Sequence, residues 1–297
     1  MTLRPGFYSH TNRNKKEKAI GARVYGLVGF PVKHSLSPCM HNAAFSALKI
    51  KAKYKLFELK PGQLSGFLGS LKQKNIYGFN VTYPYKEEIL AFLSSKSLGV
   101  KEIGAANTVV VDKSGRLKGF NTDYLGFMAH LKELKLKPKK VALVGAGGAA
   151  KAVSFALAKM KVAQLCIYDI DKFKSLSLFK KLNSSFPKTK FDVVSCLEDL
   201  ALADKDLLVN ASPVGMRQVD PCLFTCGDLH PGLFVYDLIY SPFETKLISL
   251  AKECKLNFSN GLGMLLYQGV FAFKHFSGRQ PPVEAMKKAL LKGVMSK

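Results

Sequence analysis

The chain has 297 residues and carries 45 Lys+Arg against 21 Asp+Glu, which leaves a formal net charge of +24 at pH 7. Its 47% hydrophobic residues exclude a mostly disordered chain, and its 24 Gly and 13 Pro exclude a collagenous or low-complexity one. The length is sufficient for two domains with separate cores, and the basic charge favours anionic partners such as nucleic acid, a membrane surface or an acidic small substrate.

The first two dozen residues are basic and show no apolar periodicity before Val24. We therefore expect residues 1–22 to form a solvated, disordered tail. The segment lacks the apolar core of a secretory signal, although its composition leaves a mitochondrial-type presequence open. In the absence of a secretory signal, the expected location is the cytoplasm.

Short apolar runs alternate with helix-like segments through the first half of the chain. Strands are predicted over 24–30, 54–59, 77–83 and 107–112. Helices are predicted from Pro38, over 62–73 and from about Lys86. Ser37 is placed as the N-cap of the first helix, with Pro38 at its first position. Strands separated by helices predict right-handed βαβ crossovers and a largely parallel sheet.

The second half begins after a candidate domain boundary. A Lys-rich stretch with one proline, KLKPKK at 135–140, follows a predicted helix over 124–134. The next residues predict a strand over 141–144, a glycine-rich turn and a long helix. Further strands are predicted over 164–171, 191–195, 206–212 and 233–240. After Asn260 the chain is predicted to be helical, so the fold class is α/β.

Neither a membrane helix nor a metal site is expected. The longest uncharged stretch, 256–273, contains Asn, Ser, Gly and Gln residues whose polar groups would be costly in lipid. The six cysteines form no C-x-x-C pair, and no second ligand pair with zinc-site spacing follows Cys222 and Cys226. We expect the cysteines to be free thiols in a reducing compartment.

The glycine-rich turn has the pattern of a dinucleotide site. Gly145, Gly147 and Ala150 match Gly-x-Gly-x-x-Ala, with Gly148 as an additional glycine. Such a turn bends tightly out of the strand and lets a pyrophosphate approach the backbone at the N-terminus of the next helix. Because the match follows a short apolar strand and opens a long helix, a nucleotide site is favoured over a purely structural turn.

The residue at the end of the next strand bears on which nucleotide binds. Asp169 lies about 20 residues beyond the turn, where a carboxylate would bind the ribose hydroxyls of NAD and repel a 2′-phosphate. Lys172 and Lys174 in the following loop would instead favour a phosphate. The expected cofactor is NAD or NADP, with NAD favoured.

Three polar clusters in the first half are candidate ligands for a small substrate. They are Ser35 with Ser37, Asn80 with Thr82 and Lys86, and Asn121 with Asp123. Two hydroxyls beside a helix N-terminus suit a carboxylate, and open α/β sheets bind ligands at the carboxyl ends of their strands. The structural alternatives are a helix cap for the serines and for the Asn121/Asp123 pair, and a solvated surface side chain for Lys86.

Over these motifs the chain resembles the shikimate dehydrogenase family, from Val24 to about Gly278. The matching pieces are, in order, GFPVKHSLSPCMHN, GFNVTYPYKEE, IGAANTVV, GFNTDYLGF, VGAGGAAKA, NASPVGM, YDLIYSPFETKL and NGLGMLLYQG. The resemblance implies an NAD(P)-dependent oxidoreductase of aromatic amino-acid biosynthesis that interconverts 3-dehydroshikimate and shikimate. It also implies an N-terminal α/β substrate domain, a Rossmann-type NAD(P)-binding domain and C-terminal helices that return to the substrate domain. The substrate domain would comprise residues 23–122 with 260–297, and the Rossmann domain residues 123–259.

Roles for individual residues follow from the same motifs. The resemblance makes Lys86 and Asp123 the catalytic pair. It assigns the substrate carboxylate to Ser35, Ser37 and Tyr240, and the ring hydroxyls to Thr82, Asn107 and Gln268. The cofactor-binding residues that it implies are Gly145, Ala146, Gly147, Gly148, Ala149, Asp169 and Gly261. Asn121 is expected to be structural.

Two clues point to different branches of the family. Members that use NADP carry an Asn-Arg-Thr piece after the second Rossmann strand, whereas this chain reads Tyr168-Asp169-Ile170-Asp171. This resembles the NAD-preferring quinate/shikimate branch, which is the alternative function. The Ser35-Leu36-Ser37 piece instead keeps the two serines of shikimate-specific members.

More remote alternatives are a basic nucleic-acid-binding module and a non-catalytic cofactor sensor. No reader motif or basic stripe with interleaved aromatics is found in the sequence. A sensor would have no need of the Lys86 and Asp123 pair. We therefore expect a small-molecule substrate, no nucleic-acid or membrane partner, and a monomer or homodimer.

Overall fold

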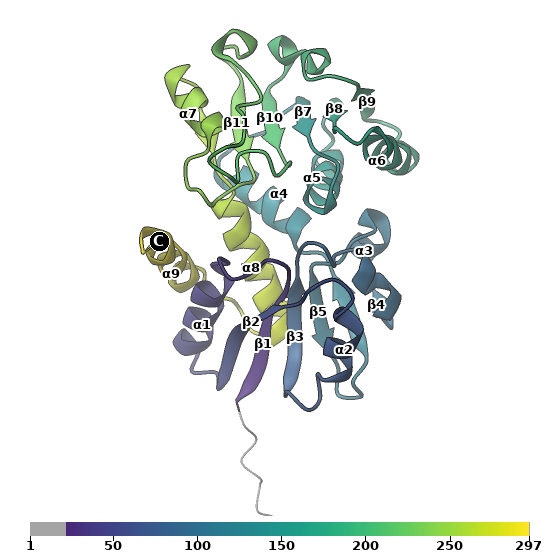
Figure 1. Ribbon diagram of the computed structural model, residues 1–297, viewed down its shortest axis with the longest axis vertical. Helices are drawn as coiled ribbons and strands as arrows, with labels where there is room; N and C mark the ends of the chain where they lie inside the picture. Colours follow the sequence, from purple (N-terminus) through teal and green to yellow (C-terminus); the bar gives the residue numbers. More distant parts are fainter. Residues whose placement is uncertain (1–21, 297) are drawn as a thin grey trace, which may run out of the picture.

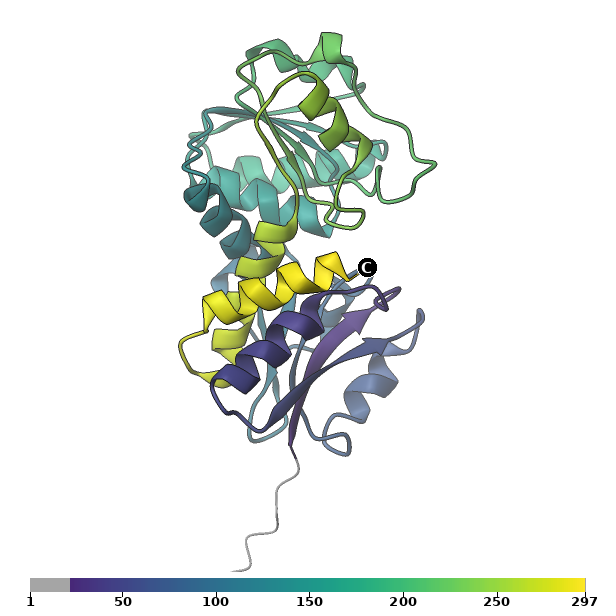
Figure 2. The same cartoon turned by 90° about the vertical axis from the view of Figure 1, so that its left-hand side faces the viewer.

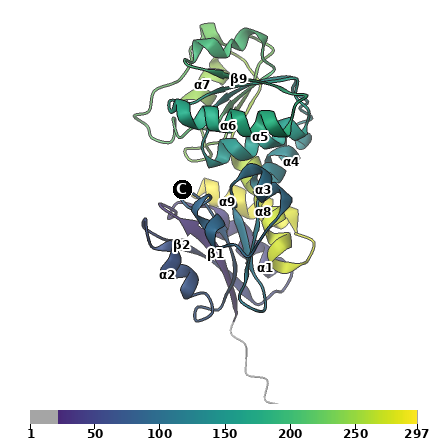
Figure 3. The same cartoon turned by 90° about the vertical axis from the view of Figure 1, so that its right-hand side faces the viewer.

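The structure, a computed structural model, describes residues 22–296. Two lobes are stacked along the long axis of the molecule, and each is built on a six-stranded sheet (Figure 1; Figure 3). The predicted basic tail lies outside the described residues except for Ala22. The α/β fold class with two sheets is confirmed.

The sheet of the first lobe has the strand order β2-β1-β3-β5-β6-β4. Its strands are β1 (Arg23–Gly29), β2 (Ala52–Glu58), β3 (Ile76–Val81), β4 (Ser95–Lys96), β5 (Thr108–Val111) and β6 (Leu117–Phe120). β1 pairs in parallel with β2 and β3, but β5 is antiparallel to both β3 and β6. Three of the five pairings in this sheet are parallel, including β4 with β6, and two are antiparallel, so the sheet predicted to be largely parallel is mixed. The reason is that residues 112–116 form a tight turn, which makes β5 and β6 a hairpin.

Of the first-lobe helices, the one predicted over 62–73 is shorter than predicted, and α3 (Leu98–Ile103) was not predicted. The other two are α1 (Ser37–Ala47) and α2 (Leu64–Gly69), and the helix predicted near Lys86 is a 3-10 helix over Glu88–Phe92. Ser37 is the first residue of α1 rather than its N-cap, which is Leu36. The backbone N–H of Ser37 donates to the Ser35 hydroxyl at 3.2 Å, so Ser35 satisfies this free donor of the first turn.

The sheet of the second lobe is parallel throughout, with the order β12-β11-β10-β7-β8-β9. Its strands are β7 (Lys140–Val144), β8 (Gln164–Tyr168), β9 (Lys190–Val194), β10 (Leu207–Asn210), β11 (Phe234–Asp237) and β12 (Phe258–Ser259). The helices that accompany it are α5 (Gly148–Lys159), α6 (Lys172–Ser185) and α7 (Lys246–Glu253). The chain leaves β7 toward β8 on one side and later returns to β10 on the other. The carboxyl end of β7 is therefore a topological switch point, where such sheets bind ligands.

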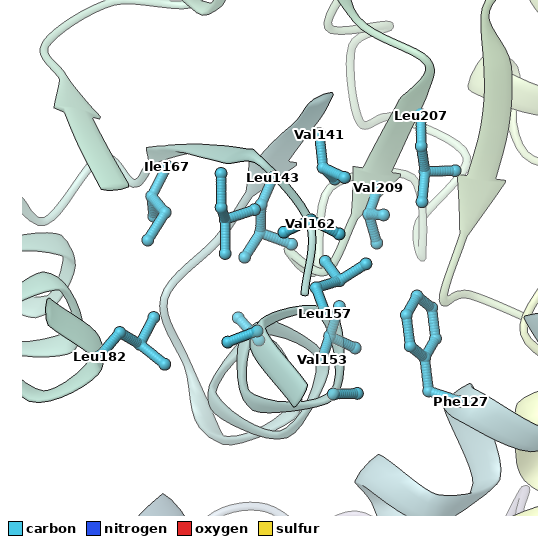
Figure 4. Close-up of a cluster of buried hydrophobic side chains, with 14 of the residues drawn as sticks. Phe127, Val141, Leu143, Val153, Leu157, Val162, Ile167, Leu182, Leu207 and Val209 are labelled. Carbon is cyan, nitrogen blue, oxygen red and sulfur yellow. The ribbon is translucent and has the colours of Figure 1, made fainter. Parts of the chain in front are cut away.

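An apolar core fixes the helix that follows the glycine turn. Val153 and Leu157 of α5 pack against Val141, Leu143 and Val209 of the sheet (Figure 4). All five side chains are fully buried. The N-terminus of α5 is thereby held rigidly at the switch point.

The two C-terminal helices return to the first lobe, as Figure 2 shows. They are α8 (Leu262–Ser277) and α9 (Val283–Met295), and they share a core with β1 and α1. α8 also packs along α4 (Asp123–Glu133), where a Cβ on Gly126 would lie 2.6 Å from the backbone N of Gln268. Met264, near the start of α8, belongs instead to the core of the second lobe. One helix therefore contributes to both cores.

One pair of cysteines departs from the sequence expectation. Cys226 and Cys254 form a disulfide that joins the 3-10 helix Cys226–Asp228 to the end of α7. Cys39, Cys166, Cys196 and Cys222 are free thiols. The expectation of free thiols is thus wrong for this pair, because the fold brings together two residues that are 28 positions apart and show no spacing signal.

Across residues 22–296, no helix is both long and apolar enough to cross a membrane. Within the same residues, no group of His, Cys, Asp or Glu side chains has the arrangement needed to hold a metal ion.

Candidate active site

The structure brings Lys86 and Asp123 into direct contact. Lys86 follows β3 at the carboxyl end of that strand, and Asp123 is the first residue of α4. The Lys86 Nζ donates to the Asp123 Oδ2 at 2.6 Å, and the two side chains are only 17% and 9% exposed. Because the pair is largely withdrawn from water, its electrostatic interaction is screened less than that of a surface ion pair.

The second oxygen of Asp123 is also occupied. Asn107 donates from its Nδ2 to the Asp123 Oδ1 at 2.6 Å. Asn121 accepts from the backbone N–H of Asp123 and donates to the Ala105 carbonyl. Both oxygens of the Asp123 carboxylate are therefore occupied, by Lys86 and Asn107, and Asn121 holds the backbone of the loop.

The predicted carboxylate ligands lie beside two tyrosines. Burial raises the pKa of Tyr240, and a hydrogen bond with the Ser35 side chain opposes that rise. Burial also raises the pKa of Tyr54 well above its usual range, and here the opposing hydrogen bond comes from the Ser37 side chain. Each serine is thus paired with a buried phenol, although only Tyr240 was expected from the sequence.

Thr82 and Gln268 are placed nearby but make no hydrogen bond to Lys86 or Asp123 in the part of the chain that is described. The backbone N–H of Thr82 donates to the Val28 carbonyl at 2.9 Å, which extends the pairing of β3 with β1. Gln268 is buried in α8, and its Nε2 donates to the Leu265 carbonyl.

The glycine turn lies next to the Lys86–Asp123 ion pair. A Cβ added to Gly148, the first residue of α5, would lie 3.3 Å from the Cδ of Lys86. An ion pair also joins the two elements. The Lys151 Nζ of α5 lies 2.7 Å from the Oε1 of Glu87, the residue that follows Lys86. The two lobes therefore meet where the lysine and the start of α5 come together.

The turn itself has the geometry that a pyrophosphate requires. Gly145 has φ +107°, and a Cβ there would lie 2.9 Å from the backbone of Ala211 and Ser212. A Cβ on Gly147 would meet nothing within 4 Å, so the backbone before α5 is accessible. The N-terminus of α5 carries the positive end of the helix dipole, and the backbone in front of it is accessible. An anionic group can therefore bind there. Ala146 and Ala149 belong to the same turn and the start of α5.

Asp169 lies at the end of β8 and is hydrogen-bonded to the turn. Its Oδ2 accepts from the backbone N–H of Ala146 at 2.6 Å, and its Oδ1 accepts from that of Asp171 at 2.8 Å. Lys174, the candidate phosphate ligand, is paired with Asp171 at 3.2 Å. The carboxylate of Asp169 thus borders the dinucleotide turn, while Lys174 is paired with Asp171 and Lys172 is exposed.

Gly261 packs closely against the backbone of Leu238. It is the N-cap of α8, and a Cβ added there would lie 1.9 Å from the Leu238 carbonyl oxygen. Its backbone N–H donates to the Ile239 carbonyl at 3.1 Å. Only glycine fits at this approach of α8 to the segment that follows β11.

Replacing Gly261 with alanine is expected to destabilise the protein by about 3 kcal/mol, the upper range for an overpacked site, because the Leu238 carbonyl is backbone and cannot rotate away. The midpoint of thermal unfolding should fall by about 10 °C. Gly66→Ala is the matched control, since a Cβ on that helical glycine meets nothing within 4 Å. Equal melting temperatures for the two variants would contradict the packing argument.

Sequence reasoning missed Tyr54, which it treated only as the start of a predicted strand. A signal was present in Asn80, whose side chain interrupts the apolar residues of β3 and is buried. A buried amide in a sheet needs polar partners, so its position indicated an internal hydrogen-bond network.

A parallel sheet in the second lobe, whose glycine turn faces a lysine–aspartate pair beside the first-lobe sheet, defines a two-lobed dehydrogenase. The shikimate dehydrogenase (NADP(+)) of Carboxydothermus hydrogenoformans is 42% identical over 278 residues, which cover 90% of this chain and 96% of that protein. The chain belongs to the shikimate dehydrogenase family. The enzyme of the same name from Methanocaldococcus jannaschii is 39% identical over 91% of this chain and 96% of its own length.

Family models match both sequence segments that build the first lobe. Residues 27–109 match the shikimate dehydrogenase substrate binding domain, and residues 261–291 match the shikimate 5′-dehydrogenase C-terminal domain. These segments are far apart in sequence but share one core in the structure.

Solved structures agree with this assignment. A shikimate dehydrogenase in complex with NADP+ has a TM-score of 0.84 at 36% identity, covering 92% of this chain and 96% of its own. The Listeria monocytogenes enzyme in complex with shikimate and NAD has a TM-score of 0.82 at 34% identity, with coverages of 91% and 96%. A quinate dehydrogenase from Corynebacterium glutamicum in complex with NAD has a TM-score of 0.84 at 31% identity, with coverages of 91% and 99%.

Proposed function

We propose that the protein catalyses the NAD(P)-dependent, reversible reduction of 3-dehydroshikimate to shikimate. The observation that carries this proposal is the closeness of the Lys86 stem to the start of α5, where a Cβ added to Gly148 would lie 3.3 Å from the Lys86 Cδ. It brings a proton donor of the first lobe to the edge of a dinucleotide turn of the second. Reduction of a ketone needs this proximity, since a hydride and a proton reach the same carbonyl group.

In this mechanism a bound nicotinamide supplies the hydride. The Lys86 ammonium donates a hydrogen bond to the ketone oxygen and transfers a proton as negative charge develops there. The Asp123 carboxylate, 2.6 Å away, orients the ammonium, and a proton taken up from solvent returns Lys86 to its charged form. Positioned acid–base groups of this kind contribute about 10²–10⁴ in rate.

The substrate ring is proposed to lie over the polar residues of the first lobe. Ser35, Ser37 and Tyr240 would hold its carboxylate, because they offer three hydroxyl donors and the start of α1. Thr82, Asn107 and Gln268 would bind the ring hydroxyls. Asn107 is supported most directly, since it already contacts the Asp123 carboxylate.

Four initial rates at 340 nm test the proposal. Shikimate and quinate are each supplied with NAD or NADP, and shikimate is expected to be oxidised with at least one of the two cofactors. Turnover of quinate in preference to shikimate would favour the quinate/shikimate branch. That alternative rests on the sequence at Asp169 and on the fold shared with a quinate dehydrogenase. No turnover with any pair would refute both.

We further propose that NAD is preferred, although the relatives compared above are named for NADP(+). The carboxylate of Asp169 borders the turn through its hydrogen bond to Ala146, and it would repel a 2′-phosphate. Replacing Asp169 with asparagine keeps an oxygen that accepts from Ala146 but removes the charge. The ratio of kcat/KM for NADP to that for NAD is expected to rise by about tenfold, which corresponds to 1.4 kcal/mol.

Asp192→Asn is the control for that change, because Asp192 is a carboxylate of β9 that bonds Gln164 instead of the turn. Its cofactor ratio should equal that of the unmodified protein. A preference for NADP in the unmodified protein would refute the proposal directly.

The remaining proposals concern organisation. We assign residues 23–122 with 260–297 to the substrate lobe and residues 123–259 to the Rossmann lobe, supported by the sharing of one core between β1, α1 and the C-terminal helices. A cytoplasmic location and a monomeric or homodimeric state remain predictions from the sequence, and size-exclusion chromatography with light scattering tests the latter.

A further inference from the structure

A chain of buried polar side chains runs through the sheet of the first lobe. Asn80 of β3 stands at its centre and is only 4% exposed. The Tyr54 hydroxyl donates to the Asn80 Oδ1 at 2.8 Å. The Asn80 Nδ2 in turn donates to the Thr108 hydroxyl at 2.9 Å and to the Asn107 carbonyl at 3.0 Å. Strands β2, β3 and β5 are thereby linked through their side chains or backbone, although β1 lies between β2 and β3 in the sheet.

The same chain continues to the acid–base pair. The Thr108 hydroxyl donates to the Asn107 Oδ1 at 3.0 Å, and the Asn107 Nδ2 donates to the Asp123 Oδ1 at 2.6 Å. Asp123 accepts from Lys86 on its other oxygen. Hydrogen bonds between side chains therefore connect Tyr54 to the Lys86 ammonium without interruption.

At the other end, Tyr54 is held between the carboxylate ligands and the aromatic core. The His41 ring stacks on the Tyr54 ring with centroids 4.3 Å apart and planes at 3°. His41 is fully buried, and neither of its ring nitrogens has a hydrogen-bond partner within residues 22–296. Burial lowers the pKa of His41 to about 3, so the ring is neutral and acts as a flat support. Ser37 is buried in α1 one turn before His41, and its side chain opposes the rise that burial causes in the pKa of Tyr54.

Packing alone does not explain this buried hydrogen-bond network, because apolar side chains would stabilise the fold about as well. Burying hydroxyl and amide groups gains little over apolar side chains of the same shape, even when every group is satisfied. A connected buried network does, however, fix side-chain positions, because its hydrogen bonds strengthen one another in a low dielectric. Rigid positioning matters most where reacting atoms must be aligned, since a shift of about 1 Å can cost about 10²-fold in rate.

We propose that Tyr54 is a positioning residue that ties the carboxylate ligand Ser37 to the Lys86–Asp123 pair through Asn80, Thr108 and Asn107. The inference rests on the proposed function and extends it. The network sets the distance between the point where the substrate carboxylate is held and the point where the ketone is protonated. Tyr54 does not touch the reacting atoms in this scheme and acts only through its neighbours.

Tyr54→Phe tests the inference, because it keeps the ring that His41 supports and removes only the hydroxyl. We expect kcat/KM for shikimate to fall about tenfold, the effect of losing one internal hydrogen bond, while KM for the cofactor changes less than about twofold. Tyr25→Phe is the matched control. Tyr25 is also a buried tyrosine of this sheet, but its hydroxyl donates to the Phe276 carbonyl outside the network.

Thr108→Val breaks the middle of the network without altering Tyr54 or Ser37. It should lower kcat more than it raises KM for shikimate, since it loosens Asn107 and through it Asp123. If Tyr54→Phe fails to fold, this variant decides the question by the same split between kcat and KM.

The outcomes separate the two proposals. An active wild-type enzyme whose Tyr54→Phe and Thr108→Val variants match Tyr25→Phe in kcat and KM would overturn the network alone. A wild-type protein that neither turns over nor binds shikimate would refute the proposed function, and the network inference with it. Equal losses of melting temperature in Tyr54→Phe and Tyr25→Phe, with loss of kcat/KM only in the former, would support the inference.

Discussion

Replacement of Lys86 with methionine is expected to lower kcat for shikimate oxidation by about 10²–10⁴-fold. Methionine keeps an unbranched apolar stem that can lie against Gly148, but it cannot protonate or stabilise an oxygen. KM for shikimate should change by much less, because Ser35 and Ser37, the proposed ligands of its carboxylate, are untouched. Loss of an interaction that matters mainly in the transition state lowers kcat and kcat/KM together.

Steady-state rates at 340 nm, with both substrates varied, measure this effect. Lys101→Met is the control, since Lys101 is an exposed lysine of α3 in the same lobe. It loses the same charge from a protein of net charge +24 and should retain full activity. A Lys86→Met enzyme with near-normal kcat would show that the lysine is not the proton donor.

Replacement of Asp123 with asparagine is expected to lower kcat by about 10²-fold, at the lower end of the range for acid–base groups. Asparagine preserves the shape but removes the negative charge that Lys86 contacts at 2.6 Å. It also presents one oxygen where the carboxylate presents two, so it cannot accept from both Lys86 and Asn107. KM for shikimate should rise as well, because Asn107 loses its fixed partner.

The double variant Lys86→Met/Asp123→Asn provides the sharpest check. Residues that act as one unit are not additive, so the double variant should be about as slow as the slower single variant. Asp112→Asn serves as the control, since that carboxylate lies in the β5–β6 turn. Additive losses of kcat in the double variant would contradict a coupled pair.

The second lobe could be predicted well because its signals are local. The apolar strand 141–144, the glycines of the turn and the long helix are adjacent in sequence, and together they define one βα unit. The first lobe was less predictable, since whether β5 runs parallel or antiparallel depends on the short turn that returns it to β6. Helix lengths also differed: the segment 62–73 has helical periodicity but contains Gly66 and Gly69, and only Leu64–Gly69 is helical.

The candidate site could be named from the sequence but not assembled from it. Lys86 and Asp123 are 37 residues apart, and only their motifs, not any spacing rule, indicated that they act together. The link from Tyr54 to Asn80 and the disulfide between Cys226 and Cys254 depend on which elements the fold places side by side. Contacts of this kind follow from tertiary packing and leave no periodic trace along the chain.

The sharing of α8 between the two cores has a consequence for the cooperativity of the molecule. Met264 is buried with the second lobe, whereas Leu266 and Phe273 are buried with the first. Melting of either lobe would expose apolar surface on a helix that the other lobe also needs, so the free energies of unfolding of the lobes are not independent. Amide protons of α8 should therefore exchange only in the global unfolding event. The helix makes the two lobes a single cooperative unit in stability, even though the catalytic chemistry is divided between them.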